Sequence, residues 1–200
     1  MLKDHGFLRL WWHNLHQITD EAWRSNQPTP ARIDAAAKKG IKTIINLRGS
    51  REDGGWRLEN EACNKNGMTL VDFTIRSRAV PDAENIHAAK VLFETVEYPI
   101  LMHCKSGADR AGIMSALYLL LRKSASLDEA TKQLSFKYFH VKQAKTGLLD
   151  AFLETYRPFE DKGISFINWV DNHLDPAEIT RKFQSKGWAT RLVDNILRRE

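Results

Sequence analysis

The sequence predicts an α/β protein with a central, mainly parallel sheet flanked by helices and a helical C-terminal extension. Three observations lead to this prediction. Between residues 29 and 121, patterns typical of helices alternate with short apolar or β-branched runs typical of strands. Beyond residue 121 the patterns are helical. Glycine and proline stand singly between these segments, where elements are expected to end.

The first half of the alternation contains two helices and two strands. A helix starts at Thr29-Pro30 and ends at Gly40, because proline suits the first turn and glycine the end of a helix. Residues 42–47 (KTIINL) follow at once as a short β-branched strand. A helix-like polar stretch over residues 57–66 then leads into a second strand over residues 69–75.

The second half contains the segment at which chemistry is expected. A helix begins near Pro81-Asp82 and ends before Pro99, and residues 100–103 (ILMH) read as a buried strand. Residues 113–121 form a helix that is apolar nearly all round, as expected of a helix buried against the sheet. In such folds ligands bind beyond the carboxyl ends of the strands, where Cys104 falls.

The C-terminal part is predicted to be helical throughout. Ser126 and Glu129 form a capping box, residues 148–156 keep helical spacing, and Asp175-Pro176 opens a further helix. An amphipathic stripe over residues 188–197 is expected to pack on the core, with a partner or a membrane as the alternative.

The composition is that of one folded domain. The chain has 200 residues, 42% of them hydrophobic, which is enough to bury a single core. We expect a domain over residues 1–157 and a helical extension over residues 158–200 packed on it. The 30 basic and 25 acidic residues are interspersed, and no basic stripe with interleaved aromatics occurs, so nucleic-acid binding is not predicted.

Residues 103–112 (HCKSGADRAG) carry the chemistry. They lie between a predicted buried strand and the start of a helix, so their backbone amides can converge on one anion with the helix N-terminus behind them. Such a nest binds phosphate without a metal ion or any other cofactor. The residues expected to bind it are Lys105, Ser106, Gly107, Ala108, Asp109 and Arg110.

Cys104 and Arg110 supply the two reactive functions of this loop. The amide nest, the helix N-terminus and the guanidinium all stabilise a thiolate on Cys104. A thiolate can attack phosphorus to give a cysteinyl-phosphate intermediate that water then hydrolyses. Arg110 follows after five intervening residues, close enough to present its planar fork to two phosphate oxygens.

This segment resembles the His-Cys-x5-Arg signature of the protein tyrosine phosphatase superfamily at His103, Cys104 and Arg110. Residues 23–28 (WRSNQP) are similar to the Arg-Ser-x-Gln-Pro entry of small dual-specificity-like phosphatases, and residues 44–48 to their first buried strand. The resemblance, which covers residues 14 to 157, implies a cysteine-phosphatase fold and an enzyme that hydrolyses phosphomonoesters. It assigns Cys104 as nucleophile, Arg110 as phosphate clamp and His103 as a neighbour that tunes the thiol.

Two residues depart from the family pattern. Ala111 stands where the family usually has Ser or Thr, whose hydroxyl helps the sulfur to leave, so hydrolysis of the intermediate is expected to be slow. Asp109 makes a Cys-x4-Asp-Arg loop, which resembles that of phosphoinositide and other lipid phosphatases, myotubularin-like enzymes among them, and some bacterial phosphatases. The implied substrate is a phosphoprotein or a phospholipid. A phosphate-binding module without turnover and a rhodanese-like sulfurtransferase are the alternatives.

Three aspartates are candidates for the general acid that protonates the leaving alcohol. Asp82 lies on the loop that carries the acid in the family, although it would also cap the following helix. Asp109 lies in the phosphate loop itself, where it could instead orient the loop, and Asp72 ranks third as a strand residue. Arg76 and Arg78 could meet further phosphates or remain solvated.

Two cysteines and the lack of a signal-peptide pattern indicate a reducing, cytoplasmic compartment. Cys63 is expected to be an ordinary buried thiol, although the family resemblance also allows a disulfide with Cys104. Residues 7–12 (FLRLWW) are expected to pack on the core, with a membrane surface as an alternative that the prediction does not require.

Overall fold

The structure is a computed structural model that describes residues 13–51 and 53–185. The sheet has five strands in the order β1-β2-β5-β3-β4. Their bounds, in chain order, are β1 His16–Thr19, β2 Ala22–Asn26, β3 Thr43–Asn46, β4 Thr69–Asp72 and β5 Ile100–Cys104. Strand β1 is antiparallel to β2, and every other neighbouring pair is parallel. The predicted mainly parallel α/β sheet is therefore confirmed.

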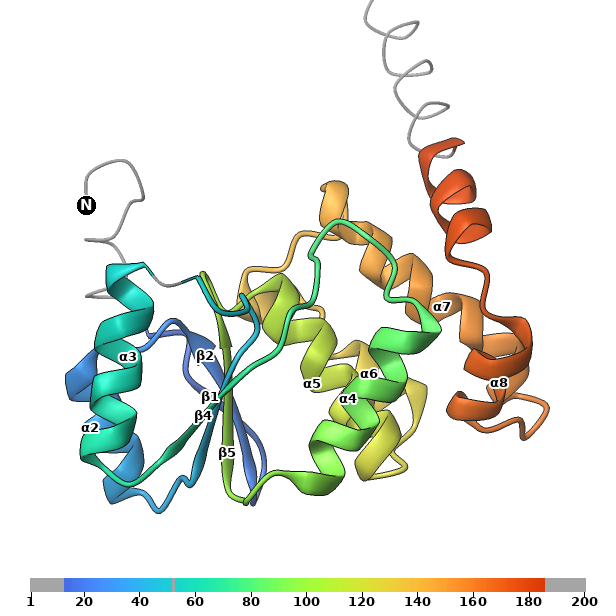
Figure 1. Cartoon of the computed structure of the whole chain (residues 1–200). Helices are drawn as coiled ribbons and strands as arrows, with labels where there is room; N and C mark the ends of the chain where they lie inside the picture. Colours follow the sequence, from blue (N-terminus) through green and yellow to red (C-terminus); the bar gives the residue numbers. More distant parts are fainter. Residues whose placement is uncertain (1–12, 52, 186–200) are drawn as a thin grey trace, which may run out of the picture.

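Helices cover both faces of the sheet (Figure 1). Helices α2 (Pro30–Lys38) and α3 (Gly54–Lys65) lie on one face, and α4 (Ala83–Thr95) and α5 (Asp109–Arg122) lie on the other. The elements after α5 are α6 Leu127–Thr131, the 3-10 turns η2 Phe136–Tyr138 and η3 Lys145–Gly147, α7 Leu148–Glu160 and α8 Phe166–His173. Residues 176–185 are also helical, whereas the stripe at 188–197 and the segment at 7–12 lie outside the described residues.

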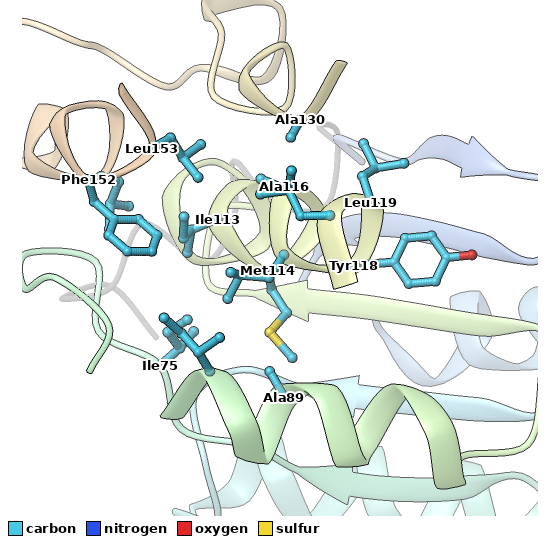
Figure 2. Packing of buried hydrophobic residues seen from close by; sticks show 14 of the residues in the cluster. Ile75, Ala89, Ile113, Met114, Ala116, Tyr118, Leu119, Ala130, Phe152 and Leu153 are labelled. Carbon is cyan, nitrogen blue, oxygen red and sulfur yellow. The ribbon is translucent and has the colours of Figure 1, made fainter. Parts of the chain in front are cut away.

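Helix α5 is the centre of the larger core. All ten residues from 111 to 120 are buried, which agrees with the apolar pattern predicted for this helix. Figure 2 shows Ile113 and Met114 between Ala89 of α4 and Phe152 of α7. Because α5 is enclosed on every side, its first turn, which carries the phosphate loop, is held in a fixed position relative to the sheet.

The C-terminal helices add to this same core. Trp169 of α8 and Ile179 from residues 176–185 belong to the cluster that α5 centres, and Phe152 of α7 lies 5.7 Å from the Trp169 ring. The separation into a domain over residues 1–157 and an extension over 158–200 stays a prediction.

The hairpin of β1 and β2 was not predicted from the sequence. Three consecutive residues of β2, Arg24, Ser25 and Asn26, are buried although all are polar, so the hydrophobic alternation that predicts a strand is absent. Strand β4 is also shorter than predicted, because it ends at Asp72 and residues 73–82 form the connection to α4.

Candidate active site

Cys104 is the last residue of β5 and therefore lies at the carboxyl edge of the sheet. It pairs with Asn26 of β2, while Asn46 of β3 pairs with the preceding His103. The chain then turns over four residues and enters α5 at Asp109, so Arg110 lies in the first turn of that helix. The structure therefore places the predicted loop between a buried strand and a helix N-terminus.

The thiol of Cys104 lies inside this turn. Its Sγ accepts a hydrogen bond from the backbone N–H of Gly107 at 3.2 Å, and the residue is 2% exposed. The N-terminus of α5, with its unpaired amides and positive end of the helix dipole, is five residues further along the chain. An amide donor and a helix N-terminus both favour the thiolate, which is the nucleophilic form of cysteine.

Gly107 allows the loop to close tightly over β2. Its φ is +76°, in the left-handed region that favours glycine. A Cβ at this position would lie 2.7 Å from the backbone N of Asn26 and 2.7 Å from the backbone C of Ser25. Both the backbone conformation and the close approach therefore require glycine here.

Arg24, a fully buried residue of β2, holds the loop from its inner, core-facing side. Its guanidinium donates to the carbonyl oxygens of Gly107 at 2.7 Å and Ala108 at 2.9 Å, and also to the carbonyl and side-chain oxygens of Gln133 at 2.6 and 3.0 Å. It also lies over the Tyr138 ring at 4.0 Å. Because the C=O and N–H of a peptide point in opposite directions, carbonyls held by Arg24 turn the amides that follow them towards the inside of the loop.

Arg24 remains charged in this buried position. Burial lowers its pKa to about 10, which is still well above neutral pH. From the sequence, Arg24 belonged to the family-like segment 23–28 and had no assigned role. No local pattern pointed to that role, because Arg24 stands in a polar run in which nothing indicates burial.

A buried histidine–glutamate pair lies next to the loop on the face of the sheet that α2 and α3 cover. His103 Nε2 lies against the carboxylate of Glu59 from α3, and both side chains are at most 1% exposed. Gln27 connects to this pair, since its Nε2 donates to Glu59 Oε2 at 3.4 Å. The sequence identified His103 as a neighbour of the thiol, but nothing in the local pattern pointed to Glu59.

Asp109 belongs to a buried chain of ionisable groups. Its Oδ1 lies 2.8 Å from His140 Nδ1, and His140 Nε2 lies 2.7 Å from Asp150 Oδ2. The His140 side chain is fully buried, while those of Asp109 and Asp150 are 26% and 11% exposed. Burial lowers the pKa of His140, but the hydrogen bonds and charges of both carboxylates outweigh it and raise the pKa to about 9.

The other two candidate acids make structural contacts. Asp82 is exposed and caps α4, accepting a hydrogen bond from the Asn85 backbone N–H at 2.8 Å. Asp72 accepts from Asn46 Nδ2 at 2.7 Å and from Trp56 Nε1 at 2.9 Å. Asp109 is thus the candidate that the fold builds into the phosphate loop.

The other residues singled out from the sequence lie in the turn, in α5 or on the connection between β4 and α4. Lys105 and Ser106 form the outer part of the turn, and the Ser106 carbonyl accepts from Asn14 Nδ2 at 3.0 Å. Ala111 is fully buried, so its methyl group takes part in the α5 core. Arg76 and Arg78 are exposed on the connection between β4 and α4.

Cys63 is a free, buried thiol. It belongs to the smaller core between α2, α3 and the sheet, whereas Cys104 belongs to the core on the α5 face. Burial and the nearby Glu59 carboxylate raise the pKa of Cys63 to about 12, which keeps it protonated. This arrangement agrees with the ordinary buried thiol that was expected.

Replacement of His140 by Gln tests the buried chain. A pKa raised from 6.5 to about 9 means that the charged histidine contributes its full stabilisation below pH 6.5 and loses it as pH rises through about 9. We expect the free energy of unfolding of the wild type to fall over this window relative to His140→Gln, by up to about 1.4 kcal/mol per pH unit for one proton.

Urea unfolding between pH 6 and 10 measures this difference. His87→Gln is the matched control, because His87 pairs with Asp171 at the surface, where solvent screens the interaction. Equal pH dependence in the wild type and in His140→Gln would contradict the charged state assigned to His140.

Within the described residues, no helix combines the length and the apolar character needed to cross a bilayer.

Several known proteins are similar to this chain. A family model described as "DSP-PTPase phosphatase fused to NAD+ Kinase" matches residues 14–148. The dual specificity protein phosphatase TpbA of Pseudomonas aeruginosa (strain UCBPP-PA14) is 26% identical over 121 residues, which are 58% of this chain and 52% of TpbA. The inositol diphosphatase DSP4 of Arabidopsis thaliana is 27% identical over 106 residues, which are 50% of this chain and 52% of DSP4. The chain thus spans about half the length of the curated relatives it matches.

Solved structures agree with the fold. The crystal structure of P. aeruginosa TpbA matches with a TM-score of 0.58 at 19% identity, covering 72% of this chain and 84% of that chain. A cysteine-to-serine variant of TpbA in complex with pTyr matches with a TM-score of 0.59 at 18% identity, covering 80% and 96%. At such identity the likeness shows the fold alone, whereas the family model covers more than half of the sequence. The chain belongs to the DSP-PTPase phosphatase family.

Proposed function

We propose that this chain hydrolyses phosphomonoesters through a cysteinyl-phosphate intermediate on Cys104. The observation that carries the proposal is the turn after β5, in which the Cys104 sulfur accepts the Gly107 amide at 3.2 Å while Arg24 holds the carbonyls of Gly107 and Ala108. Amides turned inward can bind three phosphate oxygens, and Arg110 adds charge from the first turn of α5.

The reaction would proceed in two displacements. In the first, the Cys104 thiolate forms a bond to phosphorus and the bond to the leaving oxygen breaks, with a proton from an acid going to the departing alkoxide. In the second, water loses a proton to the same group and its oxygen displaces the sulfur, which returns as thiolate with release of inorganic phosphate. Arg110 and the amides bind the negative charge of the phosphoryl group throughout.

We assign the role of acid and base to Asp109. With Oδ1 bound to His140 at 2.8 Å, Oδ2 is the oxygen left to exchange a proton with the substrate, and protonation of Asp109 for the first displacement takes place at the expense of its ion pair with His140. The side chain is partly exposed at the edge of the loop, where a leaving group would emerge. Asp82 is the other candidate for the acid, because it lies on the loop that carries the acid in the family. Its hydrogen bond with the Asn85 backbone N–H, which caps α4, is a sufficient structural reason for an aspartate at this position.

Asp109→Asn is expected to lower kcat by about 10²–10⁴-fold on a substrate whose alcohol leaves poorly, such as phenyl phosphate. The effect on p-nitrophenyl phosphate should be much smaller, because nitrophenolate leaves without a proton. Asp82→Asn and Asp72→Asn are the matched variants, and both should remain within about threefold of the wild type on each ester. A leaving-group effect in Asp82→Asn instead of Asp109→Asn would move the acid to the connection between β4 and α4.

The substrate class has two candidates. TpbA is named a dual specificity protein phosphatase and DSP4 an inositol diphosphatase, so relatives support both a phosphoprotein and a phosphorylated inositol or lipid headgroup. Asp109, which makes the loop resemble that of lipid phosphatases, favours the second. Turnover of p-nitrophenyl phosphate by the whole chain tests the general proposal, since a phosphate-binding module and a sulfurtransferase would both leave this ester intact.

A further inference from the structure

Residues 132–147 connect α6 to α7 and are called here the basic-aromatic segment. This run contains no aspartate or glutamate, although the chain as a whole has 25 acidic and 30 basic residues. Its four lysines, all exposed, are Lys132, Lys137, Lys142 and Lys145. The segment therefore carries net positive charge at its surface.

The same segment exposes large apolar side chains. Phe136 is 75% exposed, Phe139 48% and Val141 43%. In the described part of the chain, three of the six exposed large hydrophobic residues thus fall in this one connection, including both aromatic ones. The two phenylalanine rings lie 5.9 Å apart and form a single patch. An apolar patch rimmed by charge is typical of an interaction surface.

The backbone turns Phe139 outwards. Its φ is +64°, in the left-handed region that bulky residues rarely adopt, at a cost of about 1–2 kcal/mol. Tyr138 and His140 on either side are buried, at 6% and 2% exposure. The left-handed backbone thus costs energy, and a half-exposed ring recovers only part of the burial energy that a core position would give.

The segment is joined to the phosphate loop by three contacts. Asn14 Nδ2 donates to the carbonyls of both Ser106 and Tyr138, at 3.0 and 3.2 Å. Arg24 lies over the Tyr138 ring, and His140 is bound to Asp109. In Figure 1 the segment, in yellow-orange before α7, lies at the same end of the molecule as the carboxyl edge of the sheet. A surface that binds this segment is thus brought to the mouth of the candidate active site.

We propose that the basic-aromatic segment docks the protein on an anionic lipid surface, with Phe136 and Phe139 entering the headgroup layer and the lysines contacting anionic headgroups. Amphipathic elements with lysine and aromatic side chains bind membrane surfaces in this way, and each lysine contributes about 1 kcal/mol near an anionic leaflet. A peptide partner would instead call for a groove or an exposed strand edge. Resting on the proposed function, the inference also predicts that a phospholipid headgroup is the phosphomonoester presented to Cys104.

Co-sedimentation of the whole chain with phosphatidylcholine vesicles, with and without phosphatidylserine, tests this inference. Binding is expected only with phosphatidylserine, and it should weaken as salt rises. Lys142→Glu combined with Lys145→Glu should weaken binding by at least about tenfold, since two attractive charges are reversed. Lys162→Glu, at an exposed lysine in the turn after α7, is the matched charge control and should change binding by less than about threefold.

Phe139→Asn separates docking from folding. Asparagine tolerates a left-handed backbone, so the free energy of unfolding should not fall by more than about 1 kcal/mol, while vesicle binding should weaken by about tenfold. Phe136→Ser, at the more exposed ring, should weaken binding similarly. Val91→Ser is the apolar control, because Val91 is 56% exposed on α4.

Three results would overturn the inference. The first is failure of the wild type to bind phosphatidylserine vesicles at low salt, and the second is a loss of binding in the control variants equal to that in the segment variants. The third is unchanged vesicle binding in the segment variants together with a raised KM for a phosphopeptide, which would assign the segment to protein substrates. Turnover of p-nitrophenyl phosphate in the same samples keeps the two proposals apart: turnover without docking refutes docking alone, and docking without turnover refutes the proposed function alone.

Discussion

Cys104→Ser is expected to abolish turnover of p-nitrophenyl phosphate, with a loss in kcat on the order of 10⁴-fold or more. A serine hydroxyl at this position has no base in the described contacts to remove its proton, and it is a weaker nucleophile than the Cys104 sulfur, which accepts the Gly107 amide near the α5 N-terminus. Phosphate binding should persist, because the amides and Arg110 that bind the anion are unchanged.

Steady-state hydrolysis and phosphate or vanadate titration of the same preparation measure these two properties. Cys63→Ser is the matched control, since Cys63 is a protonated thiol in the core on the other face of the sheet. We expect it to keep turnover within about threefold and to lose only stability. Should Cys104→Ser retain turnover, or should iodoacetate fail to inactivate the wild type near neutral pH, the mechanism proposed for this site would be refuted.

Arg24→Met is the second change with a large expected effect. It removes the donors to the buried carbonyls of Gly107 and Gln133, at a cost of about 1–3 kcal/mol each, whereas the Ala108 carbonyl keeps the Gly112 backbone amide as a donor. We expect a total loss of about 3 kcal/mol or more in the free energy of unfolding. Because the loop amides would no longer be oriented, kcat/KM should also fall, by about 10²-fold, in the protein that remains folded.

Arg24→Lys distinguishes charge from geometry. Lysine keeps the charge but cannot span the carbonyls of the loop and of Gln133 with one planar group, so it should recover little of the lost activity. Arg57→Met, at an exposed arginine of α3, is the control and should be nearly neutral. Urea unfolding and kinetics in native buffer measure the two effects. An Arg24→Met protein with normal kcat/KM would show that the loop keeps its shape without this clamp.

The predictable part of the fold is the part with strong local patterns. The alternation of apolar strands and helices from α2 to α5, the buried character of α5 and the position of Cys104 at a strand end all follow from residues that are contiguous in the chain. The hairpin of β1 and β2 was missed because Arg24, Ser25 and Asn26 are buried through polar contacts, which produce no hydrophobic alternation.

The candidate site divides in the same way. Its chemistry is local, because six consecutive residues from 105 to 110 and the preceding Cys104 suffice to describe an anion-binding turn with a nucleophile. Its support is not local. Arg24 and Glu59 reach the turn from elements far away in the chain, and His140 and Asp150 approach it from the connection to α7 and from α7 itself.

By itself, the sequence determined the α/β class and the position of the turn that carries Cys104 and Arg110, since periodicity and spacing are properties of residues close together in the chain. Only the tertiary structure decided which side chains support the loop. It also showed that Asp109 is bound to the buried imidazole of His140, whereas Asp82 caps α4. The physical reason is that a buried charge requires partners within a few ångströms but places no restriction on where in the chain they lie.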